Sequence, residues 1–479
     1  MVEVLEAIRV LKSNSGYAPD EISLSLYRGW DDLYNMDRKA VEAFQLEAAR
    51  ERFRNLRPAV RALDIQAQQA GVNAIESLND IVPLLFQHTH YKSYPMSLLE
   101  KGRFDMLTKW FDGLTSVDLS EVDARGCTGI DNWLSLLEAE TPLQPFHTSG
   151  TTGKISFFPR TDMERDFWMF GFTKAFKGFG DEGGVKLGFD GERMPCIYPS
   201  LRYGRFVAQR LVTFMAEHVA PSPDQCYTMT NGTLSADLMS LSGRIRVAQA
   251  KGELDKFELS DSMREAMRVY LDELERRPQE TDEFMQRMMD ELKGKRVMVT
   301  SQTSYLVQAA QQGLARGIRD VFSSDSCGSV GGGGKGVVLP DDWERQIGDF
   351  TGISKWVHSY GMTEITGSMP RCPEGYYHAA AYHIPFVLDP ETGAPLPREG
   401  RQTGRFACLD LLAQTYWGGI VSGDQVTVEW DRQCPCGRKG THIHDTVTRY
   451  SEAVTGDDKV TCSATVDNTD AALKSLLRI

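Results

Sequence analysis

A loop rich in glycine and threonine near residue 150 has the residue types that bind a polyphosphate. It reads Thr148-Ser149-Gly150-Thr151-Thr152-Gly153-Lys154. The glycines let backbone amides approach phosphate oxygens, and successive N–H groups can form a nest for an anion. The hydroxyl groups add further donors, and Lys154 adds a mobile positive charge. The loop is not the Walker pattern, because position 148 is threonine and position 155 is isoleucine.

Two further motifs follow in order along the chain, Ser359-Tyr360-Gly361-Met362-Thr363-Glu364 and then Gly423-Asp424. The glutamate offers a hard oxygen ligand of the kind that Mg²⁺ prefers. Taken alone, the first motif is also typical of a strand-to-helix turn with a capping Thr-Glu pair. The second, taken alone, is typical of an ordinary turn.

In this order the three motifs resemble those of the adenylate-forming superfamily, which includes acyl-CoA synthetases, adenylation domains and luciferases. The resemblance implies that Thr148–Lys154 holds the phosphates of ATP, with Lys154, Thr363 and Glu364 as the catalytic residues. It also implies that Thr363 contacts a phosphate, Glu364 helps to hold Mg²⁺, and Tyr360 packs on adenine, with Gly361 as a further nucleotide contact. The remaining nucleotide contacts that it implies are Gly332 and Gly333 along the adenine plane, Asp424 at the ribose, and Arg449 near the hinge of the family.

Four residues have the types and spacing of zinc ligands. Cys434 and Cys436 form a C-x-C pair in a Pro/Gly turn, and Cys372 and His378 supply a thiol and an imidazole upstream. Together they would complete a closed, structural Zn²⁺ site that joins two distant segments. His383 is a spare ligand if His378 points away, and reduced surface cysteines are the alternative interpretation.

These residues extend the resemblance to the phenylacetate–CoA ligase branch, some members of which carry a Cys/His zinc here. The segment Ser301–Tyr305 also resembles the strand-to-helix corner of that branch. We expect the acid pocket between Tyr198–Tyr203 and Phe167–Phe172, with Tyr198, Arg202 and Tyr305 as substrate contacts, although such aromatic residues more often pack a core. Arg202 or Arg205 could meet a second carboxylate of the substrate, but a surface salt bridge is the favoured interpretation.

The resemblance departs from the family at the end of the chain. About a hundred residues of a mobile small domain, with a catalytic lysine, normally follow the hinge of the family, and only some thirty residues follow Arg449 here. We therefore expect an AMP-forming ligase that uses ATP and Mg²⁺ to adenylate a small carboxylic acid. The acyl group would pass to an amine, a carrier-protein thiol or a partner enzyme. The alternatives are acyl-CoA ligation, activation of another oxyanion such as nitrite, and an inactive nucleotide-binding scaffold.

The composition is that of a globular protein without a nucleic-acid partner. The chain has 479 residues, of which 41% are hydrophobic and 25% charged, with a formal net charge of −13. An acidic chain without a basic stripe does not favour nucleic-acid binding. No run reaches the roughly 20 apolar residues that span a bilayer, and the acidic N-terminus is unlike a signal peptide. The sequence therefore predicts a cytoplasmic enzyme with no membrane contact, and its nine cysteines, an odd number, do not suggest a disulfide scaffold.

Strands that alternate with helices predict an α/β fold with parallel sheets flanked by helices and a small β subdomain, which would be the large domain of the adenylate-forming fold. We expect a helical part at 1–140, a nucleotide- and acid-binding core at 141–430, and a zinc-clip region with a short tail at 431–479. Within the core, 226–295 is expected to be a helical insertion, and Arg296–Thr300 a strand that leads into a helix.

Overall fold

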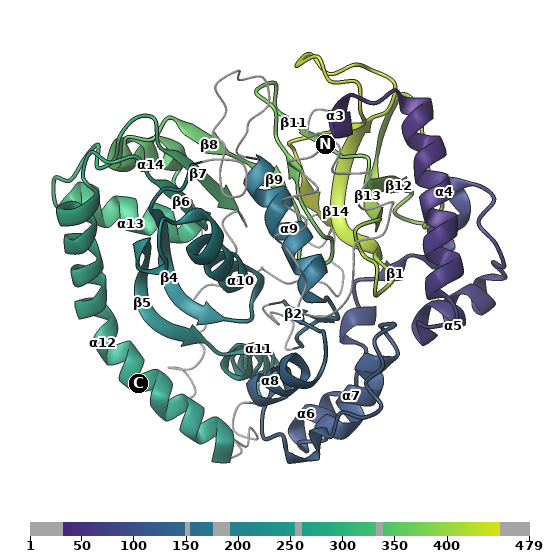
Figure 1. Ribbon diagram of the computed structural model, residues 1–479, viewed down its shortest axis with the longest axis horizontal. Coiled ribbons are helices and arrows are strands. Elements are labelled where there is room, and N and C mark those ends of the chain that lie inside the picture. The colour runs from purple at the N-terminus through teal and green to yellow at the C-terminus, as the bar shows by residue number, and fades with distance from the viewer. Residues whose placement is uncertain (1–31, 149–153, 176–191, 254–260, 332–338, 451–479) are drawn as a thin grey trace. The chain divides into compact units, whose positions relative to one another are not determined.

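A computed structural model describes residues 32–148, 154–175, 192–253, 261–331 and 339–450 (Figure 1). The chain forms two compact units, each built from separate segments. Unit 1 comprises Met1–Phe146, Ser156–Glu182 and Ser359–Lys459, and unit 2 comprises His147–Ile155, Gly183–His358 and Val460–Ile479. Each unit therefore draws on more than one of the expected domain ranges, and that division stays a prediction.

The helices of unit 1 lie mainly in its first segment, as the sequence predicts. They are α3 (Asp32–Asn35), α4 (Arg38–Leu56), α5 (Arg61–Ala70), α6 (Met96–Glu100), α7 (Phe104–Asp112), α8 (Ile130–Glu140) and α9 (Asp162–Ala175). Asp37 caps α4 by accepting a hydrogen bond from the backbone N–H of Lys39. Helix α5 ends at Gly71, whose φ of 69° is favourable only for glycine.

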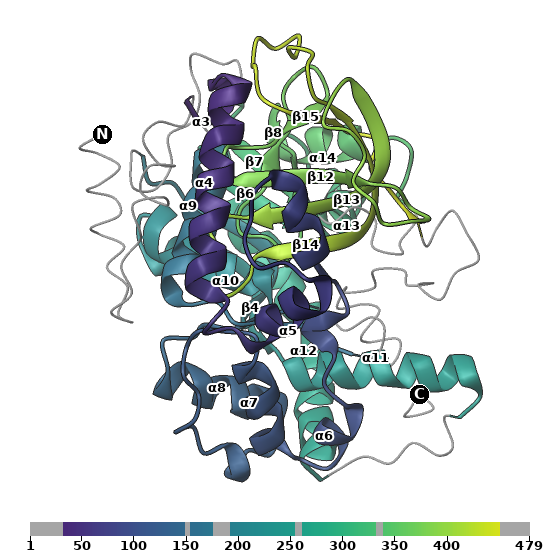
Figure 2. The ribbon, with the colours of Figure 1, turned by 90° about the vertical axis from the view of Figure 1, so that its right-hand side faces the viewer.

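A mostly antiparallel, seven-stranded sheet forms the other part of unit 1. Its central path is β11 (Tyr376–His378), β15 (His442–His444), β14 (Gly419–Glu429), β13 (Arg401–Asp410) and β12 (His383–Leu388). Strands β1 (Phe86–Gln87) and β16 (Thr448–Arg449) also pair with β14. Helix α4 lies alongside this sheet (Figure 2), where the buried Gln45 amide donates to the backbone carbonyls of Ala381 and His383.

Two further pairs of short strands form ribbons. They are β2 (Phe146–His147) with β3 (Phe157–Phe158), and β9 (Ser359–Tyr360) with β10 (Met369–Pro370). Within the described ranges, every helix is too short or too polar to cross a membrane.

Unit 2 is an α/β unit around a five-stranded parallel sheet, which confirms the predicted fold class. The strand order is β5 (Cys226–Leu234), β4 (Cys196–Gly204), β6 (Met298–Gln302), β7 (Cys327–Gly331) and β8 (Lys355–Val357). The helices are α10 (Val207–Phe214), α11 (Ala236–Lys251), α12 (Asp261–Leu292), α13 (Thr303–Ala315) and α14 (Trp343–Thr351).

The helices of unit 2 cover both faces of the sheet. Side chains of α12, α13 and α14 form one apolar core with Ile197, Tyr227 and Val299 of the strands. Helix α10 packs against β4 on the opposite face (Figure 1). Gly313 permits the close packing of α13 against α14, because a Cβ at this position would overlap the ring of Phe350 in α14.

The prediction of helix throughout 226–295 is wrong for the first residues of that range. Cys226–Leu234 is the edge strand β5, which pairs in parallel with β4, and helix begins only at Ala236. The strand alternates only partly between buried and exposed residues, as an edge strand does, so its sequence lacks the continuous apolar pattern of a buried strand. The predicted strand at 296–300 is found two residues further on, at Met298–Gln302.

A buried carboxylate connects α9 to the segment after β13. Glu164 is fully buried and accepts hydrogen bonds from the backbone N–H groups of Gln414 and Thr415 at 2.7 and 2.8 Å. It also accepts from the Thr415 hydroxyl at 2.7 Å and from the backbone and hydroxyl of Thr161. These donors compensate the loss of hydration that burying a charge entails.

We predict that Glu164→Ala destabilises the protein by about 3 kcal/mol or more, because several buried donors lose their acceptor. Glu140→Ala, at the exposed end of α8, is the control and should change stability by less than about 0.5 kcal/mol. Urea denaturation of both variants measures the two effects. Equal stability of the two variants would show that Glu164 does not hold α9 in place.

Candidate functional site

The predicted phosphate loop lies mostly outside the described residues, as do Gly332 and Gly333. Ser149, Gly150, Thr151, Thr152 and Gly153 are among those not described. Thr148 and Lys154 are described, belong to unit 2 and are partly buried. The role of this loop stays a prediction.

The motif Tyr360-Gly361-Met362-Thr363-Glu364 lies in unit 1, in the turn between β9 and β10. Tyr360 pairs with Met369 across this antiparallel ribbon, and the intervening residues form no helix. The interpretation of this motif as a strand-to-helix turn is therefore wrong. The chain instead reverses direction here.

Three residues predicted to bind the nucleotide come together in unit 1. The Tyr360 hydroxyl donates a hydrogen bond of 2.8 Å to Asp424 Oδ2. Arg449 Nε lies 3.3 Å from Asp424 Oδ1, because β16 pairs with β14 at the register Asp424↔Arg449. Burial and the Asp424 carboxylate together raise the pKa of Tyr360 above its usual range, so its hydroxyl stays a donor.

The ring of Tyr360 is held by aromatic neighbours. Its centroid lies 5.3 Å from that of Phe406, nearly perpendicular, and 5.8 Å from that of Tyr377. Asp424 keeps only 13% of its side-chain surface exposed, while Arg449 is exposed. The Tyr360 hydroxyl, the Asp424 carboxylate and the Arg449 guanidinium therefore form one continuous polar edge of the sheet.

The Glu364 carboxylate is partly buried, and no other described residue pairs with it. Its side chain has no hydrogen bond or ion pair with another residue that the structure describes, and only its own backbone N–H reaches it. Burial and the neighbouring Asp424 raise its pKa above the usual range. A buried carboxylate without a partner is stabilised by any cation or hydrogen-bond donor that reaches it.

Arg160 supports this motif, and nothing in the sequence indicates that role. Arg160 is fully buried, and its Nη2 donates 2.7 Å to the backbone carbonyl of Thr363. Its Nε donates 3.0 Å to the hydroxyl of Tyr416, and its guanidinium lies over the ring of Phe146. Arg160 therefore fixes the orientation of the peptide between Thr363 and Glu364. A single arginine in a run such as FFPRT has no pattern that would have revealed this role.

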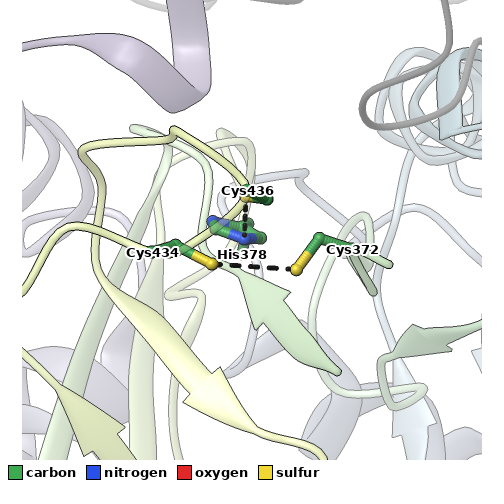
Figure 3. Close-up of side chains that lie close together, drawn as sticks. All are labelled: Cys372, His378, Cys434 and Cys436. Carbon is green, nitrogen blue, oxygen red and sulfur yellow. Dashed lines mark hydrogen bonds between the residues drawn. The ribbon is translucent and has the colours of Figure 1, made fainter. Parts of the chain in front are cut away.

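The predicted zinc ligands converge at one place in unit 1 (Figure 3). The ligand atoms of Cys372, His378, Cys434 and Cys436 all lie within 4.8 Å of one another. Cys372 Sγ lies 3.8 Å from Cys434 Sγ, and Cys436 Sγ lies 3.4 Å from His378 Nε2. Thiolates about 2.3 Å from a tetrahedral zinc lie roughly 3.8 Å apart, so these separations fit a zinc site and exceed a disulfide bond.

The protonation chemistry of the cluster also fits a metal. Burial lowers the pKa of His378 to about 3, so its imidazole is neutral, as a metal ligand must be. Burial raises the pKa of Cys372 and of Cys434, so a nearby cation is needed to deprotonate them. The interpretation as separate surface cysteines is wrong, because Cys372 and Cys434 are buried.

The spare ligand His383 lies elsewhere. It is fully buried, and its Nε2 lies 3.3 Å from the backbone carbonyl of Thr366. His378 therefore supplies the imidazole of the cluster.

The predicted substrate contacts Tyr198, Arg202 and Tyr305 are buried in unit 2. The surface salt bridge expected for Arg202 is wrong, because Arg202 is only 9% exposed and meets no carboxylate among the described residues. Phe167–Phe172 belongs to helix α9 of unit 1. The pocket expected between the two segments stays a prediction.

Comparisons with known proteins give only distant likenesses. No family model matches the chain, and no curated protein matches it. An open conformation of 2-hydroxyisobutyryl-CoA ligase with 2-HIB-AMP and CoA is 13% identical and aligns with a TM-score of 0.48, covering 91% of this chain and 75% of that one. ATP-bound MatB from Rhodopseudomonas palustris is 14% identical, with a TM-score of 0.31 and coverages of 62% and 47%. Likenesses of this size establish neither a shared fold nor a shared function.

We predict that the Tyr360–Asp424 hydrogen bond contributes measurably to stability. A double-mutant cycle of Tyr360→Phe and Asp424→Ala should give a coupling free energy of about 1.5 kcal/mol or more, because the bond is to a charged acceptor. Urea denaturation of the four proteins measures it. Tyr377→Phe replaces Tyr360→Phe in the control cycle, where we expect almost no coupling. Equal coupling in both cycles would contradict the contact.

Proposed function

We propose that this chain activates a small carboxylic acid with ATP, forming an acyl-adenylate and pyrophosphate. The acyl group would then pass to an amine, or to the thiol of a carrier or partner protein. The observation that supports this best is the convergence of Tyr360, Asp424 and Arg449. The resemblance to the adenylate-forming superfamily implies a nucleotide contact for each of the three, with Arg449 as the arginine near the hinge.

The polar edge around Asp424 suits the nucleoside end of ATP. A carboxylate accepts hydrogen bonds from the two ribose hydroxyls, and Asp424 is held for that task by Tyr360 and Arg449. Adenine would lie on the ring of Tyr360, whose aromatic neighbours fix its plane. These contacts bind substrate and product alike, so they set affinity more than rate.

The phosphate end would be held by the threonine-rich loop and the motif after β9. Glu364 is the residue that would hold a magnesium ion, since its carboxylate has no partner among the described residues. Such an ion neutralises phosphate charge and orients the α-phosphate. Thr148, Lys154 and Thr363 would donate to the phosphate oxygens, with Arg160 keeping the Thr363 peptide in place.

The reaction that these groups would assist is a displacement at phosphorus. A substrate carboxylate oxygen forms a bond to the α-phosphorus while the bond from that phosphorus to the β-phosphate oxygen breaks. Pyrophosphate leaves, and the mixed anhydride keeps the acyl group activated for an incoming nucleophile. Positioning of the carboxylate and stabilisation of phosphate charge are the two contributions required of the protein.

We further propose that Cys372, His378, Cys434 and Cys436 hold a structural zinc ion. Four protein ligands leave no open position, so the ion would stabilise the fold and take no part in the reaction. It would join the segment before β11 to the turn before β15, two parts of the chain separated by 62 residues. The binding free energy of the metal would then add to the stability of unit 1.

The proposed reaction is tested by pyrophosphate release from MgATP across aliphatic, aromatic and dicarboxylic acids, with hydroxylamine as acceptor. We expect acid-dependent release with formation of a hydroxamate, and a rate at least about a hundredfold lower in Glu364→Gln, since one stabilising group is lost. Glu391→Gln, an exposed acid of the same unit, is the matched control.

The other candidate functions give different outcomes in this assay. Release with nitrite and with none of the acids would identify another oxyanion as the substrate. AMP release that depends on CoA would identify an acyl-CoA ligase. ATP binding without release for any substrate would contradict the proposed activity, and so would full activity of Glu364→Gln.

Metal analysis tests the zinc proposal. Protein purified without chelators should contain one zinc ion per chain, and Cys434→Ala or His378→Ala should lower that content and the Tm. Cys127→Ser, which changes a cysteine outside the cluster, should keep both. Protein that is stable and free of zinc would refute the site.

A further inference from the structure

Thr366, two residues after Glu364, is fully buried and is held at each of its polar atoms. Its backbone N–H donates a hydrogen bond to Asp410 Oδ2. Its carbonyl oxygen lies 3.3 Å from Nε2 of His383, which must be the donor because a carbonyl can only accept. Its hydroxyl lies 3.3 Å from the hydroxyl of Tyr416. The far end of the turn that carries Glu364 is therefore fixed on three sides.

The near end of the same turn is held by Arg160, and side chains join the two ends. The Arg160 Nη2 donates to the carbonyl of Thr363 at 2.7 Å, and its Nε donates to the Tyr416 hydroxyl at 3.0 Å. Since Tyr416 accepts from Arg160, its own proton can go to the Thr366 hydroxyl. One chain of hydrogen bonds thus closes around the turn, with Glu364 inside it, and all of its members belong to unit 1.

Asp410 ties this turn to the seven-stranded sheet. It is 1% exposed and lies at the end of β13, where its backbone pairs with His383 of β12. Its own N–H donates to the carbonyl of Gly418 at 3.1 Å, and a Cβ on Gly418 would lie only 2.6 Å from the Asp410 carbonyl oxygen. Its Oδ1 accepts from the N–H of Leu412 at 2.9 Å. The carboxylate that holds Thr366 is therefore itself fixed.

Keeping this carboxyl charged inside the fold has a cost. Burial raises the pKa of Asp410 to about 6, although two backbone N–H groups and the charge of Arg160 lower it. The group is therefore mainly ionised at neutral pH and accepts one N–H at each oxygen, which the single oxygen of an amide could not do. Hydrogen bonds to a charged acceptor are strong, so they hold the turn in one orientation.

We propose that Asp410 is a positioning residue for Glu364, the carboxylate that would hold the magnesium ion of MgATP. By fixing the N–H of Thr366, Asp410 keeps the Glu364 carboxylate where the ion meets it without rearrangement. This role rests on the proposed function and adds to it a residue that touches neither the nucleotide nor the acid. Metal ligands commonly depend on such supporting hydrogen bonds, and loss of one weakens the metal site by about tenfold or more.

ATP binding with and without the metal tests this role without any turnover. The affinity for ATP is measured by titration calorimetry in Mg²⁺ and in EDTA, with no acid present. The wild type should bind at least about tenfold more tightly in Mg²⁺, since a charged ligand is gained. Asp410→Ala should lose most of this ratio and keep its affinity in EDTA within about twofold. Asp410→Asn, which keeps one acceptor oxygen, should lie between the two. An unchanged ratio in Asp410→Ala would overturn the proposal.

A double variant shows whether Asp410 acts through Glu364. Glu364→Gln alone should lower the same ratio. Adding Asp410→Ala to Glu364→Gln should then lower it no further, because the carboxylate to be positioned is already gone. A further loss in the double variant, or equal losses in Mg²⁺ and EDTA, would show that Asp410 only supports the fold and would refute the proposal.

Asp389→Ala is the matched control. Asp389 is another carboxylate of unit 1 that accepts two backbone N–H groups, from Glu391 at 3.0 Å and Thr392 at 2.8 Å, but it serves a different turn. Its loss should leave the ratio of affinities unchanged. If Asp410→Ala does not fold, Tyr416→Phe decides instead, because it opens the chain of hydrogen bonds around the turn. Tyr416→Phe should lower the ratio by about threefold, and no change would overturn the proposal.

Hydrogen exchange separates this proposal from the proposed function. If no acid supports turnover, the amides of residues 361–368 should still exchange at least about tenfold faster in Asp410→Ala than in the wild type, because Thr366 loses its acceptor. Asp389→Ala should leave their exchange unchanged. Unchanged exchange in Asp410→Ala would show that Asp410 does not hold this turn, whatever reaction the protein performs.

Discussion

The cost of removing a charged group from water governs this structure. Where the fold supplies partners, the charge stabilises the protein, as the several hydrogen bonds to Glu164 show. Those bonds hold helix α9 against the segment after β13. Arg160 lies just before that helix, and its guanidinium donates a hydrogen bond to the backbone carbonyl of Thr363. The motif after β9 therefore depends on a buried network for its position.

The charged and ligating groups that the fold leaves open indicate where ligands bind. Glu364 has no partner among the described residues and a raised pKa, as a magnesium ligand would before its ion arrives. The thiols around His378 are spaced for a tetrahedral ion that would deprotonate them. The same physical constraint thus supports two separate proposals, a magnesium ion at Glu364 and a structural zinc ion at the cysteine cluster, and each can fail without the other.

Sequence reasoning accounts for some of the contacts in the structure and misses others. The order of the short motifs singles out Tyr360 and Asp424 together, and the two residues are in contact in the structure. The convergence of Cys372, His378, Cys434 and Cys436 was predictable, because Cys and His at chelating spacing favour a common metal site. Strand β5 was missed because an edge strand has no continuous apolar run. The burial of Arg202 could not be foreseen, because a strand pattern does not say which arginine lacks a partner.

The central claim is that the carboxylate of an acid attacks the α-phosphorus of ATP on this protein. Exchange of labelled pyrophosphate into ATP tests it most directly, because the label enters only when an acyl-adenylate forms and reverts. The account predicts exchange that requires both Mg²⁺ and the acid and that is nearly abolished in Glu364→Gln. Exchange that proceeds without any acid, or the absence of exchange with every acid although ATP binds, would contradict it.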